Sequence, residues 1–156
     1  MALSPISSHI VLVITAATLF YVALTDLRDF KIRNELILLL VGLFVLHAIL
    51  SGRWVNIHWN IGLAVLILAI MLYYYSQNLM GGGDVKLLAV AFLWTGVHCA
   101  FPFAILWLIF VSVHFFAAKF GWVAVKEVEK RKRIPLAPSI AAALIGTFMS
   151  GCLNPL

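Results

Sequence analysis

The sequence predicts an all-α fold, a polytopic membrane bundle of about six transmembrane helices, and three observations support this prediction. The chain has 156 residues, of which 64% are hydrophobic and only 11% charged, whereas soluble domains are about 45–50% apolar and about 25% charged. A chain this short cannot bury so much apolar surface in one aqueous core. Each spanning helix uses roughly 20 residues, so we expect a single transmembrane domain over residues 1–156.

Polar segments divide the chain into six apolar runs. The runs cover about 6–24, 36–50, 61–75, 85–94, 97–120 and 139–153. The first run has no basic leading region and no small-residue cleavage site, so we expect it to remain as a span rather than to be removed as a signal peptide. The break before the fourth run contains three consecutive glycines, which hold a helix only at a cost. The break after it is the dipeptide Thr95-Gly96.

The basic residues orient the expected bundle. If the segments 25–35, 76–86 and 119–133 lie on one side of the bilayer, that side holds ten of the eleven basic residues, and only Arg53 lies opposite. The positive-inside rule makes this side cytoplasmic, which places both termini outside. The net charge of +5 then indicates attraction to anionic membrane lipid and not to nucleic acid.

All six acidic residues fall on the expected cytoplasmic side, and two of them stand at span boundaries. Asp26 ends the first run and Asp84 begins the fourth. A charged residue at a helix end costs less than one at the bilayer centre, where insertion scales give about +2.5–3.5 kcal/mol, so position alone says little about function. Asp84 could simply be the N-cap of the fourth helix. Asp29 follows Asp26 by three residues and competes with it for the same helix face.

The glycines before Asp84 strengthen a functional interpretation. Gly81, Gly82 and Gly83 allow a close approach of the backbone to another group, and their N–H groups could polarise a bound carbonyl. Lys86 could steady a developing charge, although a topology anchor is the simpler role.

Three segments of the chain resemble a known family at this point. The segment GGGDVKLLA, beginning at Gly81, is similar to the Gly-x-Gly-Asp signature of the prepilin and preflagellin peptidases. DLRDFKIRNELI, beginning at Asp26, resembles the first aspartate motif of these enzymes, and IPLAPSIAA, beginning at Ile134, resembles the proline-bearing segment that opens their last span. The order and spacing of the three pieces agree with the family. One position departs from it, because Arg33 stands where family members commonly have proline.

The resemblance implies an intramembrane aspartic endopeptidase that removes the leader of a prepilin or pseudopilin at the cytoplasmic membrane boundary. It assigns catalysis to Asp26 and Asp84 and the motif positions to Gly81 and Gly83, with Lys86 beside them, and it requires no metal and no cofactor. The cysteine-bearing insert of the larger, methylating members has no counterpart here. The chain therefore resembles the small, peptidase-only type associated with tight-adherence (Flp) pili, without methyltransferase activity.

Other features and other functions remain open from the sequence. Cys99 and Cys152 have neither metal-ligand spacing nor a disulfide framework, so we expect two thiols on apolar faces. His114, inside the fifth run, is expected to form a hydrogen bond to another helix. A small proton- or ion-coupled transport component could use the two aspartates as a relay, which would require acids along a path through the bilayer. A non-catalytic membrane scaffold would need neither aspartate.

Overall fold

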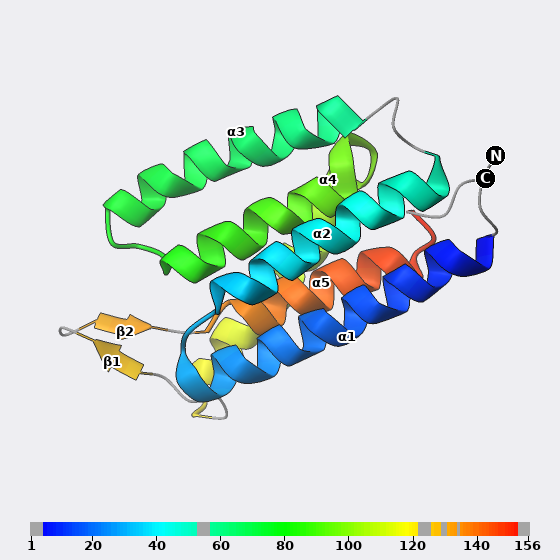
Figure 1. The fold of residues 1–156 in the computed structure, drawn as a ribbon. Helices are drawn as coiled ribbons and strands as arrows, with labels where there is room; N and C mark the ends of the chain where they lie inside the picture. Colours follow the sequence, from blue (N-terminus) through cyan, green and yellow to red (C-terminus); the bar gives the residue numbers. More distant parts are fainter. Residues whose placement is uncertain (1–4, 53–56, 122–125, 129–130, 134, 153–156) are drawn as a thin grey trace.

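The computed structural model describes residues 5–52, 57–121, 126–128, 131–133 and 135–152, and Figure 1 shows them as a bundle of helices with one short hairpin. The elements, in chain order, are α1 (Pro5–Asp29), α2 (Asn34–Ser51), α3 (Ile57–Ser76), α4 (Gly82–Lys119), β1 (Lys126–Val128), β2 (Arg131–Arg133) and α5 (Ala137–Met149). The two strands are antiparallel, with Lys126 opposite Arg133. The predicted helical bundle is confirmed, and the hairpin is an addition that the sequence analysis did not include.

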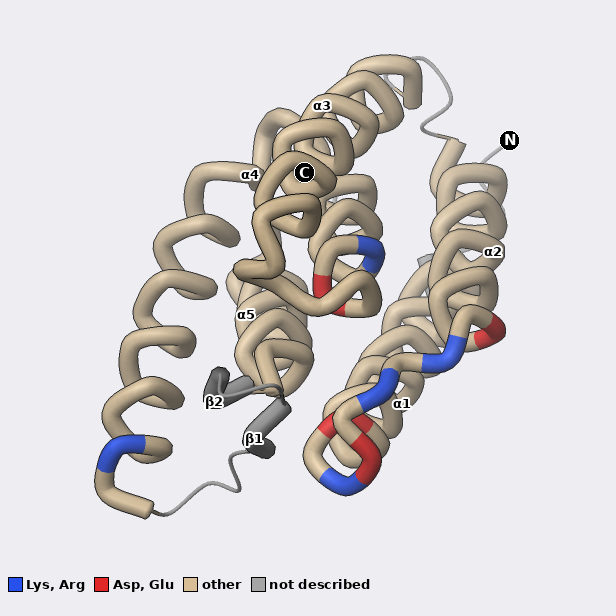
Figure 2. The backbone as a smooth tube through the Cα atoms, turned by 90° about the vertical axis from the view of Figure 1, so that its left-hand side faces the viewer, with Lys and Arg blue, Asp and Glu red and all other residues tan. Residues whose placement is uncertain are grey.

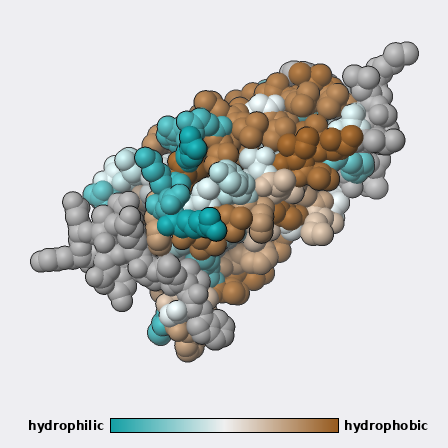
Figure 3. All heavy atoms as spheres, turned by 60° about the horizontal axis from the view of Figure 1, so that its bottom comes forward, coloured by the Kyte–Doolittle hydropathy of each residue, from teal (hydrophilic) through white to brown (hydrophobic). Residues whose placement is uncertain are grey.

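Length and composition make the bundle a multi-pass membrane protein. Four of the described helices, α1 to α4, are long and apolar enough to cross a membrane, while α5 is shorter. Hydrophobic residues cover most of the face drawn in Figure 3, and hydrophilic residues gather toward one end of it. In water such an apolar surface would be an aggregation site, whereas in a bilayer it faces lipid. The number of crossings and the side on which the termini lie stay predictions.

Helix α4 reverses its direction at Gly96, the break that the sequence predicted. Gly96 has φ 59° and ψ −173°, a conformation that residues with a side chain rarely adopt. Beyond this residue the helix runs back alongside the bundle, so that its end at Lys119 lies toward the same end of the molecule as its start (Figure 2). The single element α4 therefore contains both apolar runs that flank Thr95-Gly96 in the sequence.

Contacts with three other helices fix this reversal. The helix break removes the usual partner of the Leu93 carbonyl, and the Asn60 side-chain amide of α3 donates to that oxygen at 3.4 Å. One residue later, Trp94 Nε1 donates to the Leu40 carbonyl of α2 at 3.1 Å. The indole also packs against Phe44 of α2 and Phe148 of α5. The reversal is thus tied to α2, α3 and α5 together.

Gly96→Ala is expected to lower the stability of the bundle by about 1–3 kcal/mol, because alanine at positive φ is strained. A Cβ at this position would also overlap the side chain of Asn60. Gly42→Ala in α2 is the matched control, since nothing lies within 4 Å of the added Cβ and alanine favours helix over glycine. Thermal unfolding in detergent measures both. An unfolding temperature for Gly96→Ala equal to that of the unsubstituted protein would contradict the strained reversal.

The buried face of α1 explains how the first aspartate is positioned. Val11, Thr15, Leu19, Val22 and Asp26 are all buried, and their spacing of three or four residues places them on one side of the helix. This side packs against α5 and α2. Asp26 is the last member of the stripe, so the same periodicity that builds the core also turns its carboxyl group inward.

The cysteine prediction was wrong, because Cys99 and Cys152 form a disulfide bond. They are 53 residues apart in the sequence, with Cα atoms 6.0 Å apart. Cys99 lies just after the reversal of α4, and Cys152 lies just after α5. The antiparallel packing of these two helices brings the cysteines together, and a count of two cysteines with no framework pattern could not reveal that packing.

The charged residues of the described helices gather at one end of the bundle (Figure 2). They belong to the end of α1, the loop before α2, and both ends of α4. The start of α1 and the end of α5 lie at the other end (Figure 1). The predicted grouping is therefore present for the charged residues of the described helices, and both candidate aspartates lie in the charged group. The basic residues from 126 to 133 lie outside this comparison.

Candidate active site

Asp26 is the buried acid of the first motif. Only 4% of its surface is exposed, and its Oδ2 accepts a hydrogen bond from the backbone N–H of Ala137 at 3.2 Å. Asp29, the competing acid, is exposed at the end of α1, as is Arg28. A solvated acid at a helix end needs no further role, whereas a buried one must be held by specific partners. The structure thus separates two acids that sequence spacing alone could not separate.

The first turn of α5 supplies the partner of Asp26. Ala137 is the first residue of α5, and the N–H groups of a first turn have no acceptor within their own helix. A carboxylate is well placed at such a helix start, which carries partial positive charge. Pro138, the next residue, has no N–H to satisfy. The third family-like segment therefore contacts the first one directly.

Asp84 lies inside the first turn of α4, and the N-cap interpretation of this residue was wrong. The helix begins at Gly82, and the N-cap is Gly81, in an extended conformation with φ −75° and ψ 142°. A Cβ on Gly81 would lie 2.8 Å from Oδ2 of Asp84. The carboxyl group therefore folds back over the backbone of Gly81, and a side chain at this position would displace it.

The three glycines have different neighbours, which explains the form of the motif. A Cβ on Gly83 would lie 2.9 Å from Cβ of Ile32, an atom next to the backbone that cannot easily move. A Cβ on Gly82 would meet only the ring edge of Tyr75, at 3.3 Å. The first and third glycines are thus closely packed and the second is less restricted, which corresponds to Gly-x-Gly-Asp.

The two aspartate-bearing segments meet at the charged end of the bundle. The loop after α1 places Ile32 against Gly83, and Nζ of Lys86 donates to Oδ1 of Asn34 at 3.0 Å. Both contacts join the region that follows Asp26 to the turn that carries Asp84. Helix α1 itself packs mainly on α2 and α5, and α4 on α3 and α5. Lys86 lies at the surface and holds the α2 start, a contact that the sequence analysis missed.

Arg33 keeps the loop geometry that a proline would give. It is the N-cap of α2, with φ −75° and ψ 136°, and proline fixes φ near −65 ± 15°. Its side chain forms an ion pair with Glu35 at 2.9 Å, with both side chains well exposed. Exposed pairs of this kind contribute about 0–1 kcal/mol. The departure from the family pattern therefore leaves the loop conformation unchanged.

Arg33→Pro is accordingly expected to keep the fold and to change the stability by less than about 1 kcal/mol. Proline restricts the unfolded chain, a gain of about 0.4–1 kcal/mol, and this gain offsets the lost ion pair. Arg33→Ala, which removes the pair without the restriction, is the control. Thermal unfolding in detergent compares the three proteins, and a fall in unfolding temperature for the proline variant well beyond that of the alanine variant would show that the loop is incompatible with proline.

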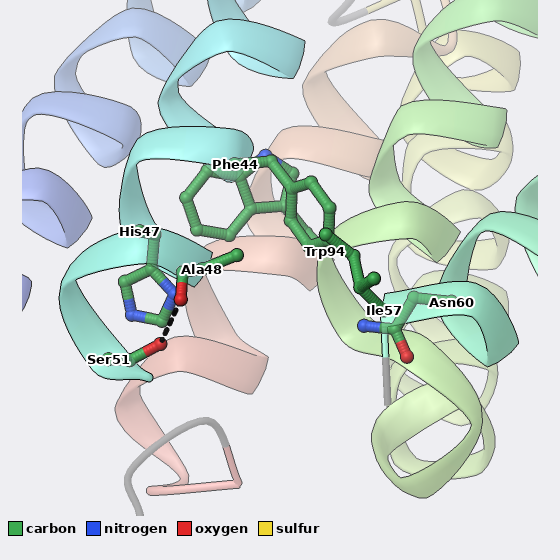
Figure 4. A pocket seen from close by; sticks show the side chains of 7 residues that line it. All are labelled: Phe44, His47, Ala48, Ser51, Ile57, Asn60 and Trp94. Atoms are coloured by element: carbon green, nitrogen blue, oxygen red, sulfur yellow. Dashed lines mark hydrogen bonds between the residues drawn. The ribbon is translucent and has the colours of Figure 1, made fainter. Parts of the chain in front are cut away.

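A small pocket lies at the other end of the bundle and takes no part in this site. Figure 4 shows it between the end of α2, the start of α3 and the reversal of α4, with His47, Asn60 and Trp94 among its walls. Ser51 on its rim donates to the carbonyl of Ala48 at 3.5 Å. The cavity measures about 40 Å³, which accommodates water but not a peptide. No residue expected at the active site lines it.

The residues at the charged end can perform acid–base chemistry on a peptide. One carboxyl group, that of Asp26, is buried and accepts the backbone N–H of Ala137 at the start of α5. The other, that of Asp84, is folded over the glycine turn at the start of α4. Within the described part of the chain, no three His, Cys, Asp or Glu side chains are grouped so as to hold a metal ion. Sequence reasoning missed Ala137, Ile32 and Asn34 as neighbours of the site. Only Pro135 and Pro138 gave a signal, because they mark a helix start.

Comparison with known proteins adds one finding. A sequence profile described as the type IV leader peptidase family matches residues 13–121. The matched region contains Asp26, Asp84 and the glycine turn. Comparisons with curated proteins and with solved structures gave no match.

Proposed function

The chain belongs to the type IV leader peptidase family, and from this membership we propose that it is an intramembrane aspartic endopeptidase with Asp26 and Asp84 as its catalytic pair. The substrate class is a pilin-type precursor, a prepilin or pseudopilin. The cut falls where the charged leader of the precursor meets its apolar segment. All of residues 1–156 serve this one activity as a single transmembrane peptidase domain.

The observation that carries the proposal is the arrangement around Asp26. A buried carboxyl group receives an N–H from the start of α5, and the loop that follows it packs on the glycine turn of Asp84. Burial of a carboxyl group in a membrane domain is expensive, so a chain that keeps one has a use for it. Pairing of the two carboxyl groups during catalysis is part of the proposal.

Two carboxyl groups that face one another hold a single proton between them, because both cannot ionise cheaply. The ionised group takes a proton from a trapped water as its oxygen attacks the scissile carbonyl carbon. The protonated group donates its proton to the carbonyl oxygen, and a tetrahedral intermediate forms. Collapse of this intermediate breaks the C–N bond. The leaving nitrogen takes the proton from one carboxyl group, and the other carboxylate takes back the proton of the intermediate's hydroxyl as the carbonyl re-forms. The reaction consumes one water, and it needs neither a metal nor a cofactor.

The neighbouring residues keep this pair in place. Gly81 leaves room for the carboxyl group of Asp84, and Gly83 lets the loop after Asp26 approach the start of α4. Lys86 holds the start of α2 through Asn34. A displacement of about 1 Å at a reacting group can cost 10²-fold in rate. We therefore assign Gly81, Gly83 and Lys86 to positioning rather than to catalysis.

The proposed location is the bacterial inner membrane, with the charged end in the cytoplasm and both termini outside. The excess of basic residues at that end supports this orientation, and it favours contact with anionic lipid. The disulfide lies beyond the reversal of α4, on the side assigned to the periplasm. Disulfides persist in oxidising compartments, so its position agrees with the orientation.

The chain is further proposed to be a peptidase only, of the small type that serves tight-adherence pili. The supporting observation is that the sequence has no counterpart of the cysteine-bearing insert of the larger, methylating members. The peptidase-only activity can be tested on the cleaved product, because a methyl group on the new amino terminus adds a defined mass.

The test is cleavage of a pilin precursor by the purified chain in vesicles that contain anionic lipid. Mass spectrometry of the products gives the cleavage site, and S-adenosylmethionine is added to reveal methyl transfer. We expect one cut between leader and apolar segment, an unmethylated product, and a rate unaffected by a metal chelator. An intact precursor, for each of several pilin types tested, would reject the proposal.

A further inference from the structure

On α5 and on the part of α4 beyond Gly96, three buried polar side-chain atoms have no hydrogen-bond partner within the described part of the chain. They are Nε1 of Trp107, Nε2 of His114 and Oγ of Ser139. Ser139 is the most enclosed residue of the three, with 3% of its surface exposed. The interhelical hydrogen bond expected of His114 is therefore not formed at Nε2. A buried polar group left without a partner costs about 1–3 kcal/mol, so groups of this kind call for a ligand or a water.

The three residues lie on two helical segments that pack on one another, α5 and the second part of α4. The Cys99–Cys152 disulfide shows that the two segments run antiparallel, and a Cβ on Gly146 would lie 3.4 Å from Leu106. Two helical turns are about seven residues. Seven residues inward from this contact, Ser139 on α5 lies level with Val113 on α4. Val113 is exposed, whereas His114, the next residue, is half-buried. Trp107 is next to Leu106 and seven residues before His114, so the Trp107 and His114 side chains share one side of α4. The boundary between this part of α4 and α5 is called the seam below.

The inner end of this seam lies beside the proposed active site. Ser139 and Ala137 belong to the first turn of α5, and the N–H of Ala137 bonds to Asp26. Helices rise 1.5 Å per residue, so Ser139 lies within one helical turn of Ala137, whose N–H holds the catalytic carboxyl group. The Thr147 hydroxyl, farther along α5, bonds to its own helix at the Ala143 carbonyl, 2.8 Å away. The Ser139 hydroxyl, near the proposed active site, has no such bond to its own helix.

A peptide that is cut inside a membrane needs hydrogen-bond partners for its backbone near the cleaved bond. Its scissile bond becomes accessible only if its helix unwinds locally, and unwinding leaves backbone N–H and C=O groups that lipid cannot satisfy. The indole N–H donates, the serine hydroxyl donates and accepts, and the imidazole Nε2 does one or the other. We propose that Trp107, His114 and Ser139 bind the unwound backbone of the substrate next to the scissile bond. This proposal rests on the proposed peptidase function.

Binding of a labelled precursor peptide, measured in anionic vesicles with the Asp26→Asn protein to prevent cleavage, tests the proposal. Adding Ser139→Ala is expected to weaken binding by about tenfold, the value of one hydrogen bond, without lowering the unfolding temperature. Adding His114→Phe is expected to weaken it similarly and provides a second variant should the first fail to fold. In the protein that retains Asp26, Ser139→Ala should raise KM and leave kcat nearly unchanged.

Two control substitutions separate substrate binding from packing. Thr147→Val on α5 and Ser112→Ala on α4 remove hydroxyls that already bond within their own helices, so binding should not change. Unchanged binding in both Ser139→Ala and His114→Phe, or equal weakening in the controls, would overturn the inference. A fall in kcat at constant KM would also overturn it, because these side chains would then hold a water used in the reaction and not the substrate backbone. Failure of the proposed peptidase function gives a different result: the precursor is not cleaved, but peptide binding still depends on Ser139.

Discussion

Asp26→Asn and Asp84→Asn, made separately, are each expected to lower the rate of precursor cleavage by about 10²–10⁴-fold, the usual contribution of a positioned acid or base. Asparagine can neither take nor give the proton that the mechanism requires. It does keep an oxygen that can accept the N–H of Ala137, so the site of Asp26 should remain folded. Rates are measured under single-turnover conditions in vesicles, with circular dichroism and thermal unfolding as checks on the fold.

Asp29→Asn is the matched control for this prediction. It removes the same charge three residues away, from an acid that is exposed and not buried, so the cleavage rate should stay within about twofold of the parent protein. Loss of activity in Asp29→Asn with full activity in Asp26→Asn would move the catalytic role to the other acid. Full activity in Asp84→Asn would remove the pair altogether.

Gly83→Ala is expected to lower the cleavage rate by about 10²-fold, although alanine normally favours a helix. The added Cβ would lie 2.9 Å from Cβ of Ile32, so the loop after Asp26 must move away from the start of α4. A displacement of about 1 Å at an active site can have this effect. Ile32→Ala in the same protein makes room for the new methyl group and should restore part of the rate.

Gly81→Ala should have a comparable effect for a different reason, because its Cβ would displace the carboxyl group of Asp84 directly. Gly82→Ala is the control within the same turn, since it meets only the ring edge of Tyr75, at 3.3 Å. Cleavage assays of the three alanine variants therefore rank the glycines. An equal loss in all three would indicate a general need for flexibility and would contradict the packing explanation.

The sequence predicted the helices and the grouping of charges because both follow from local patterns. Apolar runs and their breaks predict the element boundaries to within a few residues, and the break at Thr95-Gly96 coincides with the positive φ of Gly96. The distribution of Lys and Arg along the chain likewise predicted which segments share one end of the bundle. The two short strands were not expected, since three residues per strand within a basic segment carry no alternating pattern.

The contacts between distant segments could not be predicted in this way. Cys99 and Cys152 appeared as unrelated thiols because their pairing depends on how α4 and α5 pack. Asp26 and Asp29 were both candidates because helix spacing gives a face but does not say which partner covers it. Only the position of α5, with the N–H of Ala137 on the Asp26 carboxyl group, separates the two acids.

The most direct test of the catalytic pair is a structure of the protein with a bound peptide whose scissile amide is replaced by a hydroxyl-bearing, uncleavable group. Our account predicts that oxygens of Asp26 and Asp84 both lie within about 2.6–3.2 Å of that one hydroxyl. A complex in which the hydroxyl contacts only one of the two side chains, with the other turned to a different face of the bundle, would contradict it.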